Sequence, residues 1–298
     1  MSEFNNTEKI AVTGATGHLG KLVVGSLLNR GASPSSITAI VRNTKKAAGL
    51  ADRGIEIREA DYSKPETLGS ALEGIDKLLL VSSSEVGQRA AQHKNVIDAA
   101  KNVGVKLIVY TSVLNADTAQ IKLAGEHKAT EELIRSSGIP YIFLRNGWYL
   151  ENYDAAIDQA GKTGALYGSA GDGRISAASR ADYAEAAAAV LIGPVEANSV
   201  FELGGDASFT MKELAEKISD ATATDVEYKD LPVADYAALL VSAGLPEPYA
   251  EILADSDLGI SRGELYTDSK HLSALIGRPA ATIEEVRRNG HLNHHAAA

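Results

Sequence analysis

The fold expected of this chain follows from one stretch, Val12-Thr13-Gly14-Ala15-Thr16-Gly17-His18-Leu19-Gly20. The apolar run Ile10–Thr13, typical of a buried strand, leads into this stretch, and the helical pattern Leu19–Asn29 continues from it. Three glycines at the spacing G-x-x-G-x-x-G, set between a strand and a helix, are typical of a turn that holds a dinucleotide. A structural turn without a ligand is the alternative.

Each glycine of this turn has a separate physical reason. Gly14 permits the tight turn, Gly17 lets the backbone approach a pyrophosphate, and Gly20 lets the helix pack close to the sheet. The free N–H groups and the dipole of the helix then face the phosphates. The residues of the turn that we expect to contact the cofactor are Gly14, Thr16, Gly17, His18, Leu19 and Gly20.

Short apolar runs alternate with helical patterns through the first half of the chain. The expected strands are Ile10–Thr13, Ile37–Val41, Ile55–Arg58, Lys77–Val81, Lys106–Thr111 and Tyr141–Leu144. The expected helices are Leu19–Asn29, Thr44–Asp52, Pro65–Leu72, Ala90–Asn102 and Lys122–Ser136, each followed by a glycine suited to a left-handed cap. Nearly every strand is apolar throughout, which is typical of a parallel sheet covered on both faces. We therefore expect an α/β fold with a doubly wound parallel sheet of the Rossmann type.

The pattern changes after about residue 146. The Gly-rich stretch Gly161–Gly173 predicts a loop or a short hairpin, and an Ala-rich helix after Arg180 leads to a strand around Val200–Leu203. From Thr210 the chain is mostly helical. We expect a nucleotide-binding domain over residues 1–150, to which 175–205 returns, and a smaller, mostly helical C-terminal lobe built from 151–174 and 206–298, which holds the substrate.

The end of the second strand indicates which dinucleotide binds. It reads Ile40-Val41-Arg42-Asn43, with Lys45 and Lys46 close behind, and lacks the acid that normally holds a free 2′-hydroxyl. A guanidinium suits a 2′-phosphate, so NADP(H) is the expected cofactor. An ordinary solvated Arg42 is the alternative.

Polar residues follow three further strands, at the edge of the sheet where doubly wound folds bind ligands. Asp61 and Tyr62 follow the third strand, Ser82, Ser83 and Ser84 the fourth, and Thr111 and Ser112 end the fifth. We expect these residues to contact the cofactor, with Asp61 placed to accept from the adenine amino group. Each of the first five could equally be a cap or a turn residue.

Composition excludes several classes of function. The 298 residues carry 29 Lys and Arg against 39 Asp and Glu, a net charge of −10 that disfavours nucleic acid and membrane surfaces as partners. The chain has no Cys, so disulfides, iron–sulfur clusters and thiol nucleophiles are excluded. Met1–Lys9 lacks the pattern of a secretion signal, and we expect a cytoplasmic protein. The His-containing tail, His291–Ala298, is expected to be disordered and not to bind a metal.

Six segments together indicate a family: 10–20, 39–43, Lys77-Leu-Leu-Leu-Val-Ser-Ser-Ser-Glu-Val-Gly-Gln-Arg89, Leu144-Arg-Asn-Gly-Trp-Tyr149, Arg180-Ala-Asp-Tyr183 and Leu253-Ala-Asp-Ser-Asp257. In these segments the sequence resembles the NmrA-like family of atypical short-chain dehydrogenases, within it the bacterial type 2 NAD(P)H:quinone oxidoreductases and, more distantly, triphenylmethane reductase. The resemblance implies a flavin-free enzyme that passes hydride from NADPH to a quinone or a similar electron-poor acceptor. It also leaves two alternatives open: an NADP(H) sensor without turnover, and a reductase of an enone, imine or dye. A homodimer is possible.

The catalytic group is not the usual Tyr-x-x-x-Lys pair. The pair should stand on the helix after the fifth strand, but the one literal match, Tyr266 to Lys270, lies far downstream in the C-terminal lobe, and we reject it. In many NmrA-like relatives a Lys stands on the helix after the fifth strand, and matching on spacing places His127 there with Glu131 one turn on. His127 is therefore the expected contact to the nicotinamide ribose and a candidate proton donor. A partly exposed His127 paired with Glu131 at i, i+4 is the alternative, and Lys128 is expected to face solvent.

Residues after the sixth strand are expected to line the substrate side. Asn146 and Tyr149 join His127 as candidate catalytic residues, and a planar acceptor suits an aromatic wall with a few donors. Trp148 is as consistent with the core as with this wall, and Arg145 is expected to form a structural ion pair. No cluster of His and carboxylates predicts a metal site.

Overall fold

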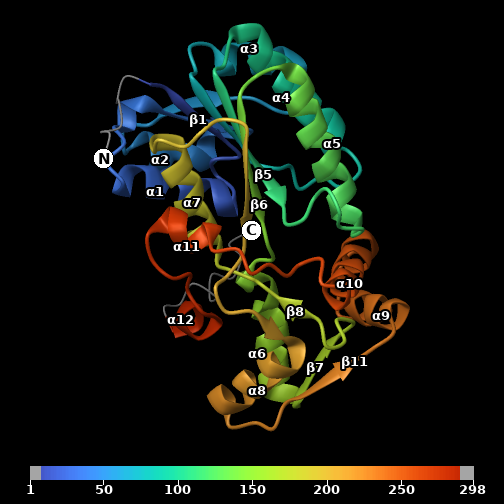
Figure 1. Cartoon of the computed structure of the whole chain (residues 1–298). Coiled ribbons are helices and arrows are strands. Elements are labelled where there is room, and N and C mark those ends of the chain that lie inside the picture. Colours follow the sequence, from blue (N-terminus) through green and yellow to red (C-terminus); the bar gives the residue numbers. More distant parts are fainter. Residues whose placement is uncertain (1–7, 289–298) are drawn as a thin grey trace.

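The computed structural model describes residues 8–288 and is built on a seven-stranded parallel sheet with strand order β3-β2-β1-β4-β5-β6-β9 (Figure 1). The strands are β1 (Ile10–Thr13), β2 (Ile37–Val41), β3 (Glu56–Glu59), β4 (Lys77–Leu80), β5 (Leu107–Val113), β6 (Tyr141–Asn146) and β9 (Ser199–Leu203). The strand order reverses between β1 and β4, and doubly wound folds bind ligands at the carboxyl ends of the strands beside such a reversal. The predicted fold class is confirmed.

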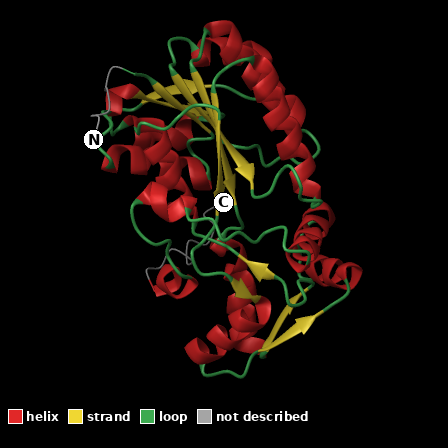
Figure 2. Ribbon diagram, viewed as in Figure 1, coloured by secondary structure: helices red, strands yellow, loops and turns green. Residues whose placement is uncertain are grey.

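Helices cover both faces of the sheet (Figures 1 and 2). On one face lie α1 (His18–Asn29), α7 (Arg180–Ile192) and α11 (His271–Ile276), and on the other lie α3 (Pro65–Leu72), α4 (Arg89–Val103) and α5 (Lys122–Ser137). The side chains of β1 alternate between the two cores: Ile10 and Val12 pack with the first set of helices, and Ala11 packs with the second. Buried apolar side chains on both faces explain why these strands lack polar alternation.

The segment from 175 to 205 carries α7 and β9, and β9 pairs with β6 at the edge of the sheet. The C-terminal lobe contains the remaining elements, which cover the carboxyl edge of the sheet (Figure 1). They are α6 (Asp154–Thr163), β7 (Ala165–Gly168), β8 (Arg174–Ile175), β10 (Phe209–Thr210), α8 (Met211–Thr222), β11 (Glu227–Asp230), α9 (Val233–Ser242), α10 (Glu247–Ser261) and α12 (Ile283–Arg288).

The prediction of a loop or hairpin over Gly161–Gly173 is wrong. The segment begins inside α6, and its strand β7 pairs in parallel with the distant β11. One of the glycines serves close packing: a Cβ on Gly173 would lie 2.2 Å from the carbonyl oxygen of Ile260 in α10. Two others have local roles, since Gly164 caps α6 with a φ of +75° and Gly171 lies in a turn with a φ of +52°.

Two smaller differences concern the edge of the sheet. The helix expected over 44–52 is divided into a 3₁₀ turn (Thr44–Ala47) and the single-turn α2 (Ala48–Ala51). β3 is an edge strand with exposed ends, so it lacks the double burial of its neighbours. The tail His291–Ala298 lies outside the described residues. Within 8–288, no helix is both long and apolar enough to cross a membrane.

Candidate active site

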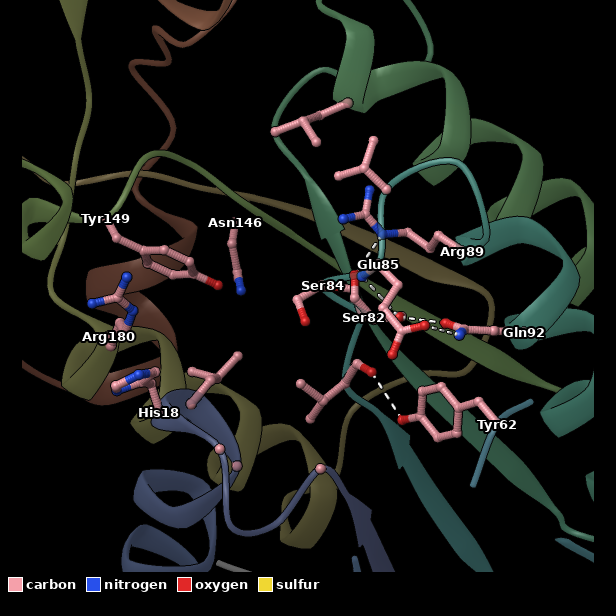
Figure 3. A pocket seen from close by; sticks show the side chains of 18 of the residues that line it. His18, Tyr62, Ser82, Ser84, Glu85, Arg89, Gln92, Asn146, Tyr149 and Arg180 are labelled. Atoms are coloured by element: carbon pink, nitrogen blue, oxygen red, sulfur yellow. Dashed lines mark hydrogen bonds between the residues drawn. The ribbon is translucent and has the colours of Figure 1, made fainter. Parts of the chain in front are cut away.

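A cavity of about 1070 Å³ runs along the carboxyl ends of the strands and beneath the C-terminal lobe (Figure 3). Its wall combines the turn after β1, the ends of β2, β5 and β6, the loop after β4, the start of α7 and one side of α10. The volume is at the upper end for small-molecule sites, which suits an extended ligand with a second molecule beside it. Every predicted site residue except Thr111 lines the cavity.

The glycine turn is shaped for an anion. Gly14 has a φ of +57°, and its carbonyl oxygen accepts from the Gly17 N–H at 2.8 Å. A Cβ on Gly20 would lie 2.3 Å from that same oxygen, so only glycine fits there. Helix α1 has neither a side-chain cap nor an acid in its first turn, so its first N–H groups are open to a phosphate.

The far end of the cavity is cationic. Arg42 and Lys46, which follow β2, both line it. Tyr62 forms the neighbouring wall: its hydroxyl lies 2.5 Å from Thr13 Oγ1 and 3.0 Å from the Val81 carbonyl, which joins three strand ends. Burial raises the pKa of Tyr62, so the hydroxyl stays protonated and keeps its hydrogen bonds to the neighbouring strand ends. Asp61 accepts from the Ser63 N–H at 2.9 Å, so it forms a turn as well as lining the cavity.

Thr111 lies behind the wall and not in it. Its side chain is buried, and Thr111 Oγ1 accepts from the Ser82 N–H at 2.9 Å. The residue therefore positions the serine loop, which does face the cavity. The sequence predicted that Thr111 ends the fifth strand, but β5 continues to Val113, and the Thr111 side chain contacts the Ser82 N–H and does not enter the cavity.

A buried histidine holds the same serine loop. His93 Nε2 accepts from the Ser83 N–H at 2.9 Å, so the proton of the neutral ring is on Nδ1, which lies 2.9 Å from Thr130 Oγ1. The Thr130 hydroxyl donates in turn to the Glu126 carbonyl at 2.9 Å. Burial, helped by the charge of Arg89, lowers the pKa of His93 to about 3. The loop is thus supported by a neutral hydrogen-bonded chain.

His127 lines the cavity from α5 and is buried. Its Nδ1 lies 2.7 Å from the Tyr110 hydroxyl, and burial together with the charge of Arg89 lowers the pKa of His127 well below its usual value. The alternative prediction, a partly exposed His127 paired with Glu131, is wrong, because His127 is buried and Glu131 is bonded to Arg145. His127 is therefore a neutral hydrogen-bonding group near neutral pH. Lys128, the next residue, is exposed.

Glu131 belongs to the floor beneath the site. It receives two hydrogen bonds from Arg145, at 2.9 and 2.8 Å, and one from the Ser112 hydroxyl at 2.7 Å. Arg145 also donates to Glu202 on β9 at 2.7 Å. The predicted structural ion pair of Arg145 is therefore confirmed. This buried network ties α5, β5, β6 and β9 together and occupies the Ser112 hydroxyl.

Asn146 and Tyr149 both line the cavity, and Figure 3 shows the Tyr149 hydroxyl directed toward the Asn146 side chain. Asn146 is buried, and its Oδ1 has no hydrogen-bond partner among the described residues. Burial raises the pKa of Tyr149, whereas the Asn146 side chain and the charge of Arg180 act in the opposite direction. The Arg180 guanidinium lies 4.7 Å from the centre of the Tyr149 ring. Buried polar groups without partners are a feature of ligand sites, and Asn146 Oδ1 is one here.

Both interpretations of Trp148 are confirmed, because its side chain lines the cavity and also packs into the core of the C-terminal lobe. Tyr266 and Lys270 do not line the cavity, and Lys270 pairs with Asp206 at 3.4 Å. Residues 8–288 contain no group of three His, Cys, Asp or Glu that could hold a metal ion.

Comparison with known proteins identifies the family of this chain. The model of the NmrA-like family matches residues 6–274. The chain belongs to the NmrA-like family.

Its relatives include Quinone oxidoreductase 2 of Escherichia coli, which is 52% identical over 276 residues, 93% of this chain and 96% of that protein. The crystal structure of the NADPH-dependent quinone oxidoreductase from E. coli in complex with NADPH is 51% identical, with a TM-score of 0.91 over 96% of this chain and 100% of that one. The Citrobacter triphenylmethane reductase in complex with NADP(H) is 39% identical, with a TM-score of 0.88 over 94% and 99% of the two chains.

Several residues of this NmrA-like site escaped prediction from the sequence. Arg180, Glu85 and Arg89 line the cavity, as does an apolar group from the C-terminal lobe that includes Leu245 and Tyr249. Arg180 starts α7, and the two lobe residues lie in or beside α10, so none of the three is at a strand end. The 53% exposure of the Tyr249 side chain is a sign of a ligand-contacting role, but this exposure is visible only in the structure.

Proposed function

We propose that this chain is a flavin-free oxidoreductase that transfers a hydride from NADPH to a quinone or to a similar electron-poor conjugated acceptor. The observation that carries the proposal is the continuity of one cavity, from the glycine turn and Arg42 to Asn146 and Tyr149 beneath α10. Nucleotide-binding and acceptor-binding features therefore share one space, as hydride transfer between two bound molecules requires.

The residues present fit NADP(H). The turn from Gly14 to Gly20 would hold the pyrophosphate, since its helix N-terminus is uncapped and free of acids. Arg42 and Lys46 would hold the 2′-phosphate, and Asp61 and Tyr62 would line the adenine site. When bound, NADPH supplies the hydride. The proposal includes no flavin and no metal between cofactor and acceptor.

The acceptor side supplies hydrogen bonds rather than a strong acid. The reaction consumes one NADPH, one proton and one acceptor, and yields NADP⁺ and the reduced acceptor. The raised pKa of Tyr149 keeps its hydroxyl protonated and able to donate to an acceptor carbonyl, where negative charge develops after hydride arrival. Neutral His127 would hold the nicotinamide ribose, and the proton comes from Tyr149, His127 or water. Proximity then supplies most of the rate.

The names of the relatives support this reaction class: one is a quinone oxidoreductase, and another is a triphenylmethane reductase. We place the chain among the atypical short-chain dehydrogenases and in the cytoplasm, where NADPH is available. The homodimer stays a prediction. A sensor that binds NADP(H) without turnover is the second candidate, because the cavity lacks a Tyr-x-x-x-Lys pair and His127 is neutral.

The test is an assay of NADPH and NADH oxidation at 340 nm against benzoquinone, naphthoquinone and a triphenylmethane dye. His127→Ala is assayed beside the native chain, with Lys128→Ala as the control because Lys128 is the adjacent, exposed residue. We expect turnover with at least one quinone, reduced in His127→Ala and unchanged in Lys128→Ala. NADPH binding without oxidation of any acceptor would favour the sensor, and full activity in His127→Ala would remove His127 from the mechanism.

A further inference from the structure

An acid lies at the cationic end of the cavity. Glu85, in the loop after β4, lines the cavity and accepts from Arg42 Nη1 at 2.8 Å. Its second oxygen, Oε2, accepts from Gln92 Nε2 at 2.7 Å, and Figure 3 shows the two side chains together. Gln92 is in turn bound to the Ser83 hydroxyl, which lies 2.5 Å from Gln92 Oε1. Gln92 of α4 therefore fixes one oxygen of Glu85, while the other oxygen contacts Arg42.

We propose that Glu85 is a specificity-determining residue, which competes with the 2′-phosphate of NADPH for Arg42 and so reduces the preference for NADPH over NADH. The proposal rests on the proposed function, because it requires NADP(H) in this cavity. A phosphate at Arg42 must displace the carboxylate or lie beside it, and like charges repel. NADH has a hydroxyl in that position, which leaves the pair intact and can itself donate to a carboxylate.

Because the Arg42–Glu85 ion pair is exposed, a substitution there can change cofactor specificity without a large change in the stability of the fold. The side chains of Arg42 and Glu85 are 66% and 43% exposed, and ion pairs this open to water contribute little to folding. Glu85→Gln keeps a side-chain oxygen for Gln92 and removes only the negative charge. The variant is therefore expected to fold normally and to change the binding of the 2′-phosphate alone.

The experiment compares two pairs of probes on the full chain: NADPH with NADH, and 2′,5′-ADP with 5′-AMP. Each pair differs by the 2′-phosphate. The control is Asp98→Asn, which removes one negative charge from an exposed ion pair with Lys94 on α4, outside the cavity lining. We expect Glu85→Gln to raise the affinity ratio within each pair about threefold to fivefold, the size that exposed ion pairs reach. An unchanged ratio, or a change matched by Asp98→Asn, would overturn the proposal.

The variant Arg42→Ala tests whether Glu85 acts through Arg42. In the Arg42→Ala background, Glu85→Gln is expected to change the ratio by less than about twofold, since the cation that Glu85 contacts is absent. A full effect in that background would overturn the competition. Failure of the two proposals is distinguishable: wild-type protein that binds neither NADPH nor 2′,5′-ADP contradicts the proposed function, whereas NADPH binding indifferent to Glu85 contradicts this inference alone.

Discussion

Substituting Gly20 by Ala tests the glycine turn most strictly. The new Cβ would lie 2.3 Å from Gly14 O and 2.9 Å from the Ala15 Cα, whereas Cβ atoms essentially never approach closer than 3.0 Å. The start of α1 must therefore move by about 0.7 Å, the difference between 3.0 and 2.3 Å. Gly14 O also accepts the Gly17 N–H at 2.8 Å, so the movement disrupts the turn itself.

We expect Gly20→Ala to lower the free energy of unfolding by about 1–3 kcal/mol, the usual cost of overpacking. Losing one charged hydrogen bond to a phosphate, about 1.5–3 kcal/mol, should weaken NADPH binding roughly tenfold to a hundredfold. The matched control is Gly25→Ala in the same helix, where a Cβ meets nothing within 4 Å. It should stabilise the chain by up to about 1 kcal/mol and leave binding unchanged. Thermal unfolding and titration of NADPH fluorescence measure both effects. NADPH binding by Gly20→Ala within twofold of wild type would refute the reasoning.

Three further predictions concern the walls and the floor of the cavity. Arg145→Met leaves the buried Glu131 with Arg135 as its remaining cationic partner, so denaturant unfolding should show a loss of about 3 kcal/mol, the low end for a broken buried pair, and a loss below about 1 kcal/mol would argue against the floor network. The pKa of His93 is about 3 in the folded state, below its unfolded value of about 6.5. The contribution of neutral His93 to the free energy of unfolding is therefore fully present above about pH 6.5. It declines by about 1.4 kcal/mol per pH unit as the pH falls toward 3. The difference in stability between wild type and His93→Gln should follow that slope between pH 6 and 4, and a parallel pair of curves would contradict it. Tyr149→Phe should lower kcat about tenfold to a hundredfold with the KM for NADPH unchanged, and an unaltered kcat would remove the hydroxyl from the reaction.

The sheet and the ligand-binding edge were predictable because both follow from local rules. Short, largely apolar runs such as Ile37–Val41 are typical of strands buried inside a parallel sheet, and all five of its residues are buried. The glycines after the predicted helices, such as Gly104 and Gly138, both have a φ of +79°, as a left-handed cap requires. Once the sheet is known, residues that follow its strands meet at one edge.

The C-terminal lobe was less predictable because its contacts are between distant segments. β7 pairs with β11, and nothing local in Ala165–Gly168 identifies Glu227–Asp230 as its partner. Arg180 and Tyr249 enter the site from α7 and α10, which do not follow a strand of the seven-stranded sheet. Glu85 was quoted within a family segment, but its role depends on the distance to Arg42, which sequence spacing does not give.

The central claim is direct hydride transfer from NADPH to a quinone in this cavity. The most direct measurement is the rate of quinone reduction with NADPH and with NADPH deuterated at C4, together with the ratio of NADPH consumed to quinone reduced. The account predicts one NADPH per quinone and a slower rate with the deuterated cofactor, by protein with no flavin absorbance. NADPH that binds but reduces no quinone, or turnover that requires added flavin, would contradict it.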